Sequence, residues 1–137
     1  MRKVRDNIIL VVVGLFFIGG YFYYTYVETA DIKNDFSQTT GYIYEFAEHE
    51  HENSIASTRY KYSVNGKEYE RGTFGMEPCK GMKEFRTEIM RIKYPIVYSN
   101  SDPEKSRILV SPKQFEEYGL PFPKEMKHVF ETFWFCK

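Results

Sequence analysis

The residues best suited to chemistry are two histidines set among glutamates. His49 and His51 lie two positions apart, and Glu48 and Glu50 precede them in turn. In a β-strand, residues at i and i+2 point to the same face, so both imidazoles could ligate one metal ion together with the neighbouring carboxylates. The alternative is a solvated hairpin loop whose histidines face water, because two histidines without a third fixed ligand make a weak site. No cofactor is expected elsewhere.

Two cysteines, Cys79 and Cys136, are the other reactive side chains. An oxidising compartment would permit a disulfide between them, but the sequence alone leaves their pairing open. A thiol nucleophile at Cys79 would need a histidine base, and no histidine lies in a recognisable catalytic context. We therefore assign no catalytic residue and expect a protein that is not an enzyme.

An uncharged stretch near the N-terminus predicts how the chain is placed in the cell. Residues 8–27 carry no charge and extend about 30 Å as a helix, which is the thickness of a bilayer's hydrocarbon core. Tyrosines are concentrated in residues 21–26, as expected where a helix leaves the membrane. Basic residues precede the stretch: Arg2, Lys3 and Arg5. By the positive-inside rule, residues 1–7 are cytoplasmic and residues 8–27 form a transmembrane helix.

The same stretch is also compatible with a cleaved secretory signal, since it combines a basic start with an apolar run up to Gly20. No A-x-A-like site follows, because cleavage after Gly20 would leave Ile18 at the third position. We therefore favour an uncleaved anchor in the inner (cytoplasmic) membrane, with lipid contacts over residues 8–27. The C-terminal part would then lie in the periplasm or outside the cell.

The remaining residues predict one small domain on a short tether. Residues 28–38 are polar and are interpreted as a stalk, and residues 39–137 as an extracytoplasmic α+β domain. Aromatic residues make up 18% of the chain, which favours strands. Nineteen basic residues balance nineteen acidic ones without a long basic run, so nucleic acid is not an expected partner.

The clearest local pattern is a hairpin turn at Asn65-Gly66. Both residues tolerate positive φ, and a two-residue loop fixes the register of the flanking strands. The predicted opposite pairs are Val64 with Lys67, Tyr62 with Tyr69, Tyr60 with Arg71, Lys61 with Glu70 and Ser63 with Glu68. An earlier strand is predicted over residues 39–47, with Tyr42, Tyr44 and Phe46 on one face.

Three helices and two further strands are predicted beyond the hairpin. Residues 82–92 favour a short helix, residues 94–99 and 107–110 favour strands, and Ser111 caps a helix that Gly119 ends. A final amphipathic stripe consists of Met126, Val129, Phe130, Phe133 and Trp134. This last helix packs either on its own sheet or at the membrane interface. The predicted fold is a small antiparallel sheet, or partly open barrel, of about five strands with C-terminal helices.

These motifs resemble a known group of proteins. Four motifs follow one another along the chain: Gly41-Tyr42-Ile43, the hairpin over residues 60–69, the strand over residues 94–98 and the turn over residues 102–106. Their order resembles that in small bacterial membrane proteins grouped as domain of unknown function 3592. The chain also resembles short anchored proteins of Bacteroidetes. The chain departs from that pattern at residues 99–101 and in its long segment between hairpin and later strand. The resemblance implies a fold and a bacterial envelope setting, and it implies no established activity.

Three functions are compatible with this sequence. The first is a non-enzymatic envelope module that binds a partner protein through its sheet edge or its aromatic face. The second is an immunity or accessory protein against an envelope-active toxin, for which the gene neighbourhood would be decisive. The third is a metal-binding module that uses the His49 and His51 segment.

Overall fold

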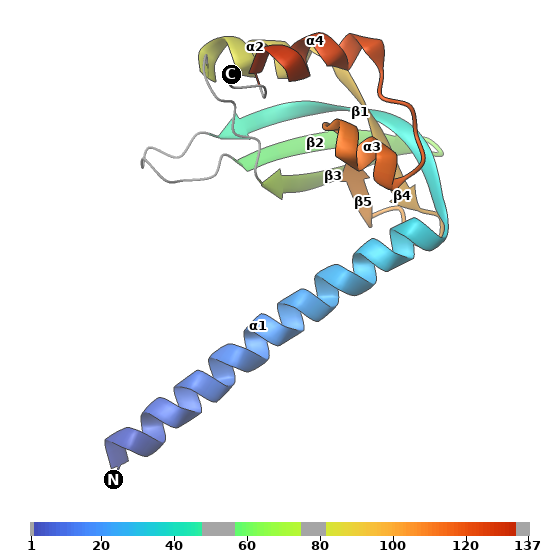
Figure 1. Ribbon diagram of the computed structural model, residues 1–137. Helices are drawn as coiled ribbons and strands as arrows, with labels where there is room; N and C mark the ends of the chain where they lie inside the picture. The colour runs from blue at the N-terminus through green and yellow to red at the C-terminus, as the bar shows by residue number, and fades with distance from the viewer. Residues whose placement is uncertain (1, 48–56, 75–81, 134–137) are drawn as a thin grey trace.

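The computed structural model describes residues 2–47, 57–74 and 82–133, which form a long helix followed by a small α+β domain (Figure 1). This architecture confirms the predicted fold class. The elements in chain order are α1 (Arg2–Asn34), β1 (Phe36–Ala47), β2 (Ser57–Val64), β3 (Lys67–Phe74), α2 (Met82–Arg91), β4 (Lys93–Ser99), β5 (Ser106–Ile108), α3 (Pro112–Glu117) and α4 (Lys124–Phe133).

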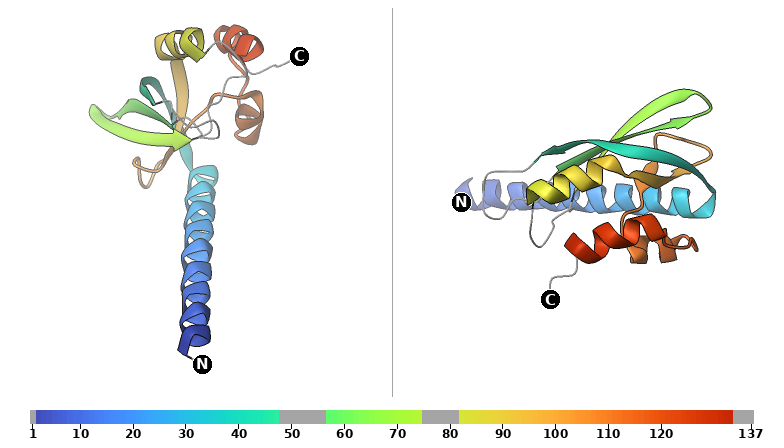
Figure 2. Two further views of the ribbon diagram at one scale, coloured as in Figure 1. Left: turned by 90° about the vertical axis from the view of Figure 1, so that its left-hand side faces the viewer. Right: turned by 90° about the horizontal axis from the view of Figure 1, so that it is seen from above.

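Helix α1 projects from the domain as a single rod (Figure 2). Large apolar side chains are exposed along it between Ile9 and Tyr26, with exposed fractions from 45% at Val13 to 81% at Phe16. Among the described residues, α1 is the one helix long and apolar enough to cross a membrane, over Ile9–Asn34. Its exposed apolar surface is what a lipid environment would cover.

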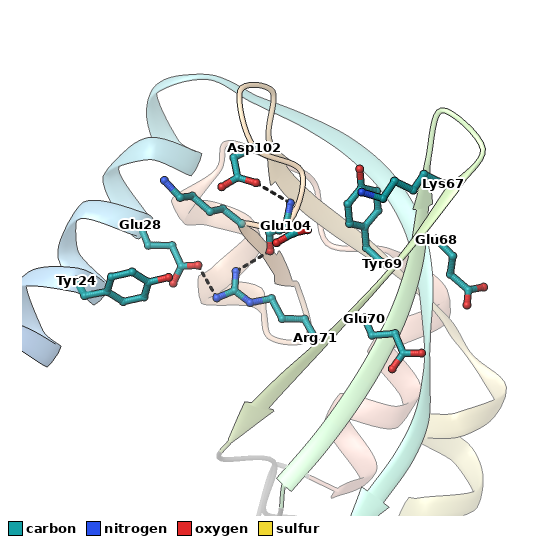
Figure 3. A pocket seen from close by; sticks show the side chains of 10 residues that line it. Tyr24, Glu28, Lys67, Glu68, Tyr69, Glu70, Arg71, Asp102 and Glu104 are labelled. Carbon is teal, nitrogen blue, oxygen red and sulfur yellow. Dashed lines mark hydrogen bonds and ion pairs between the residues drawn. The ribbon is translucent and has the colours of Figure 1, made fainter.

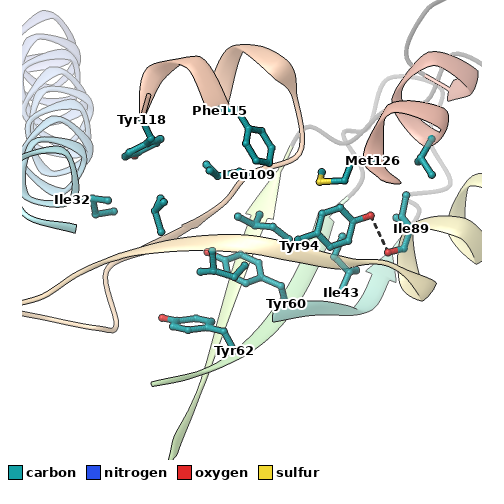
Figure 4. Packing of buried hydrophobic residues seen from close by; sticks show 14 of the residues in the cluster. Ile32, Ile43, Tyr60, Tyr62, Ile89, Tyr94, Leu109, Phe115, Tyr118 and Met126 are labelled. Carbon is teal, nitrogen blue, oxygen red and sulfur yellow. Dashed lines mark hydrogen bonds between the residues drawn. The ribbon is translucent and has the colours of Figure 1, made fainter. Parts of the chain in front are cut away.

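The five strands form one antiparallel sheet in the order β3-β2-β1-β4-β5, curled into a half-barrel. Helices α2, α3 and α4 pack against the sheet and enclose the hydrophobic core between them (Figure 4). Tyr60, Phe115 and Ile96 are among its most completely buried side chains. Burying each such side chain contributes about 1.5–3 kcal/mol, so this core is the main source of the domain's stability.

The β2–β3 hairpin has the predicted register at every pair. Asn65 and Gly66 occupy positive φ, at 52° and 82°, as the two-residue turn requires. Tyr62 and Tyr69 stack across the strands with ring centroids 5.5 Å apart. Turn chemistry and aromatic pairing therefore select the same register.

Strand β1 differs from its predicted face pattern. Its pairing with β2 shifts between Ile43 and Glu45, which is a β-bulge. Because a bulge adds one residue to one strand, it reverses the alternation of faces. Ile43 and Phe46 are therefore buried while Tyr42 is 45% exposed, so the prediction that Tyr42 and Phe46 share a face is wrong.

The C-terminal helices behave as the sequence predicts. Ser111 and Gln114 form a capping box at the start of α3, and Gly119 follows it at φ 66°. In α4, Met126 and Val129 are buried. The described part of this helix thus packs on its own domain rather than on a membrane.

The predicted stalk over residues 28–38 is corrected by the structure. Helix α1 continues to Asn34, and β1 already begins at Phe36. Ile32 is only 2% exposed, and the ring of Phe36 packs edge-on against Tyr118 with centroids 5.2 Å apart. Because docking on the domain stabilises these polar turns as helix and strand, they form part of the domain instead of a free linker.

Candidate functional site

The residues singled out from sequence for metal or thiol chemistry lie outside the described residues. His49 and His51, with Glu48 and Glu50, fall in residues 48–56. Cys79 falls in residues 75–81 and Cys136 in residues 134–137, so neither the metal site nor the disulfide can be placed. Within the part of the chain that the structure does describe, no three His, Cys, Asp or Glu side chains gather as a metal site.

The most elaborate polar arrangement is instead the junction between α1 and the domain. Side chains of the last turns of α1, and of the residue after it, contact four segments of the domain. We call this set of contacts the helix clamp: Glu28 with Arg71, Thr29 with Arg107, Asp31 with Lys105, Lys33 with Glu117, and Asp35 with Asn100. The clamp joins α1 to β3, the β4–β5 loop, β5 and α3.

Arg71 is the central residue of the clamp because it spans the open seam of the half-barrel, which is the gap between the edge strands β3 and β5. Its guanidinium forms an ion pair with Glu28 and donates hydrogen bonds to the carbonyls of Glu104 at 3.0 Å and Ser106 at 3.4 Å. Burial is the largest single influence and would lower the pKa of Arg71, but the hydrogen bond to Glu28 and the charge of Glu28, with smaller contributions from Tyr60 and Tyr62, together raise it. Arg71 therefore stays charged and holds β3, the β4–β5 segment and α1 together.

Buried tyrosine hydroxyls close the same seam from inside. Tyr60 Oη lies 3.1 Å from Ser106 Oγ, and Tyr62 donates to the Pro103 carbonyl at 2.5 Å. Burial raises the pKa of Tyr60 to about 12. Strand β2 thus contacts the β4–β5 loop and the first residue of β5 across the inside of the curled sheet.

Two of the remaining clamp contacts are short. Lys105 Nζ lies 2.6 Å from Asp31 Oδ2, and this hydrogen bond raises the pKa of Lys105. Asn100 Nδ2 donates to Asp35 Oδ1 at 2.6 Å, and its backbone N–H donates to the Asp35 carbonyl at 3.1 Å. Individual surface pairs contribute little, but several contacts to four segments around the buried Ile32 fix one orientation of the helix.

A cleft of about 500 Å³ opens beside the clamp, between α1, β3 and the β4–β5 loop (Figure 3). We call it the junction cleft. Its lining residues are Tyr24, Glu28, Lys67, Glu68, Tyr69, Glu70, Arg71, Asp102, Glu104 and Lys105. Five are acidic and three are basic, so the cleft presents both signs of charge with an acidic excess.

The lining of the junction cleft is suited to recognition by charge and hydrogen bonding. Several of its charges are satisfied within the protein: Glu28 pairs with Arg71, and Glu70 accepts from Lys61 and Tyr44. The hydrogen bonds from Lys61 and Tyr44 hold the pKa of Glu70 below its usual range. Among the described residues, the lining contains no His, Cys or Ser, so it holds no Ser–His or Cys–His pair.

The edge of the sheet at β3 is a second candidate surface. Among the described residues, β2 is its only strand neighbour. The residues flanking a two-residue loop form a hydrogen-bonded pair, and bonding then alternates along the ladder. The backbone N–H and C=O groups of Glu68, Glu70 and Gly72 therefore point away from β2, where a strand of another chain could pair with them.

Sequence reasoning missed both the clamp and the junction cleft. Glu28 and Asp31 were placed in a stalk, and Arg71 was recognised only as the partner of Tyr60 in the hairpin. One signal pointed to the helix: residues 21–40 contain no glycine or proline that would end it. The partners of the clamp residues lie at least 43 positions further along the chain, at separations where no local pattern operates.

Comparison of the chain with protein-family models, with curated proteins and with solved structures found no match. The resemblance to domain of unknown function 3592 therefore stays a prediction. The function is accordingly argued from the geometry of the clamp, the cleft and the β3 edge.

Proposed function

We propose that this chain is a single-pass membrane protein whose N-terminus lies in the cytoplasm and whose domain is a non-enzymatic binding module in the periplasm or outside the cell. The apolar length of α1 and the basic residues before it support this placement. So does the exposure of Tyr21, Tyr23 and Tyr26, each at least 70%. Cleavage after Gly20 would leave those rings in water, whereas an uncleaved anchor places them at the membrane interface.

The observation that carries the binding function is the open edge of β3. Eight residues, Lys67–Phe74, run along it, and the described part of the chain provides no strand to cover it. Charged side chains at Lys67, Glu68 and Glu70 disfavour unspecific edge-to-edge association. The edge is therefore suited to a selected partner, whose extended segment adds to β3 as a further strand.

Gly72 allows a sharp test of this proposal. Its N–H points away from β2, so Gly72→Pro removes one hydrogen bond available to a partner and leaves the β2–β3 ladder intact. Gly72→Ala is the matched control, because a Cβ there would lie 3.8 Å from the Thr58 carbonyl, an ordinary contact. Circular dichroism of both purified variants would confirm that the fold is preserved.

The measurement is quantitative mass spectrometry of proteins that co-purify with the full chain from crosslinked membranes. The proposal predicts a partner that is retained by the wild type and by Gly72→Ala and is lost with Gly72→Pro. An unchanged set of co-purifying proteins with Gly72→Pro would refute binding at this edge.

A further inference from the structure

The position of the junction cleft along α1 sets its depth relative to a membrane. The uncharged stretch ends at Val27, and Glu28, the next residue, already contacts the domain. Tyr24 lies one helical turn before Glu28, about 6 Å along the axis, and forms a wall of the cleft (Figure 3). Since tyrosines at the end of a membrane helix lie among the lipid headgroups, the cleft opens at headgroup level.

The charges that remain available in the cleft have both signs. Lys67 is exposed, and its Nζ lies 4.8 Å from the ring centroid of Tyr69. On the opposite wall, Glu104 is exposed beside the partly buried Asp102, whose Oδ1 accepts the backbone N–H of Glu104 at 3.2 Å while its other oxygen accepts no such bond from the described residues. A purely anionic ligand would meet the acidic excess, whereas a zwitterion can place each of its charges against the opposite sign.

We infer that the junction cleft binds the headgroup of an aminophospholipid of the phosphatidylethanolamine class. Its ammonium would donate hydrogen bonds to the carboxylates of Glu104 and Asp102, and its phosphate would lie toward Lys67. A primary ammonium donates such bonds, but the trimethylammonium of a choline lipid has no N–H and cannot. The preference for an amine headgroup therefore follows from the carboxylates on the wall of the cleft.

Lipid is the occupant because of where the cleft lies. A headgroup is already present at the depth of Tyr24, and little loss of translational freedom accompanies its binding there. The inference rests on the membrane-anchoring part of the proposed function, and the cleft shares Lys67, Glu68 and Glu70 with the β3 edge.

The test uses the full chain reconstituted into lipid nanodiscs that contain phosphatidylethanolamine, phosphatidylcholine and phosphatidylglycerol in equal parts. The chain is then released in mild detergent, and the retained lipids are quantified by mass spectrometry. The double variant Lys67→Gln with Glu104→Gln removes one charge of each sign from the cleft. The matched control, Lys127→Gln with Glu131→Gln, makes the same changes at an exposed pair on α4 whose charged atoms lie 3.7 Å apart.

The inference predicts that phosphatidylethanolamine is enriched over phosphatidylcholine, and that the cleft variant loses this enrichment by about three- to tenfold, as expected for two partly exposed charged contacts. The control variant retains it. Equal retention of the amine and choline lipids, preference for the anionic lipid, or equal loss in both variants would overturn the inference. A chain that remains outside the lipid particle would overturn the anchor, and the lipid site with it.

Discussion

Ile32 tests whether the end of α1 belongs to the core of the domain. It is 2% exposed, so Ile32→Ala removes three buried carbon atoms. At about 0.8 kcal/mol for each carbon, the lost transfer free energy is about 2.4 kcal/mol. The cavity left behind raises the expected loss in the free energy of unfolding to about 2.5–4 kcal/mol. For a domain of this size, the unfolding midpoint would fall by roughly 10 °C or more.

The assay is thermal unfolding of the full chain in detergent, followed by near-ultraviolet circular dichroism of its tyrosines. Ile18→Ala is the matched control, because Ile18 lies in the same helix but is 56% exposed and outside the domain. Its effect on the domain should be below about 0.5 kcal/mol. If Ile32→Ala unfolds within that same margin of the wild type, then α1 does not contribute to the core and residues 28–34 act as a stalk.

Three further variants test other parts of the structure. Gly41→Ala should destabilise the sheet by about 1–3 kcal/mol in chemical denaturation, because the added Cβ would collide with the backbone carbonyl oxygen of Lys61 and would lie 2.9 Å from Ile96 Cγ1. The contribution of Tyr60 to the free energy of unfolding should be constant below about pH 10, its unfolded pKa, and should fall by up to about 2–3 kcal/mol as the pH rises to about 12. Alkaline titration of Tyr60→Phe should show a shallower fall. Arg71→Ala should cost about 1–3 kcal/mol in thermal unfolding, because Glu28 loses its partner.

Matched controls separate these effects from general sensitivity to substitution. Gly72→Ala should be nearly neutral, because its Cβ meets only an ordinary contact. Arg91→Ala removes a guanidinium that is 72% exposed and should change stability by less than about 0.5 kcal/mol. If the free energy of unfolding falls equally at alkaline pH in the wild type and in Tyr60→Phe, burial does not raise the pKa of Tyr60 as assigned. Equal losses in the Arg71 and Arg91 variants would contradict the role of the clamp.

Features governed by neighbouring residues could be predicted from the sequence. The Asn65-Gly66 turn fixed the whole register of β2 and β3, because positive φ at two adjacent positions allows one turn geometry. The cap at Ser111 and the end of α3 before Gly119 depend on side chains within four residues of one another. The number of strands and the fold class followed from patterns of the same short range.

Features that depend on distant residues could not be predicted. The bulge in β1 reverses the alternation of buried and exposed side chains after Ile43, and no residue type in that segment predicts a bulge. The polarity of residues 28–38 favoured a stalk, since the partners that order them, such as Arg71 and Lys105, lie far along the chain. The junction cleft was missed for the same reason, because three separate segments form its walls.

The central claim is that α1 runs without a flexible link from the apolar stretch into the domain. The most direct measurement is the distance distribution between two spin labels, one at Tyr23→Cys on α1 and one at Lys113→Cys on α3, by pulsed electron paramagnetic resonance. The chain would carry Cys79→Ser and Cys136→Ser, so that only the introduced thiols are labelled. We predict a single narrow distribution in a lipid nanodisc. A broad distribution would show that the domain moves freely on its anchor and would contradict the structure of the junction.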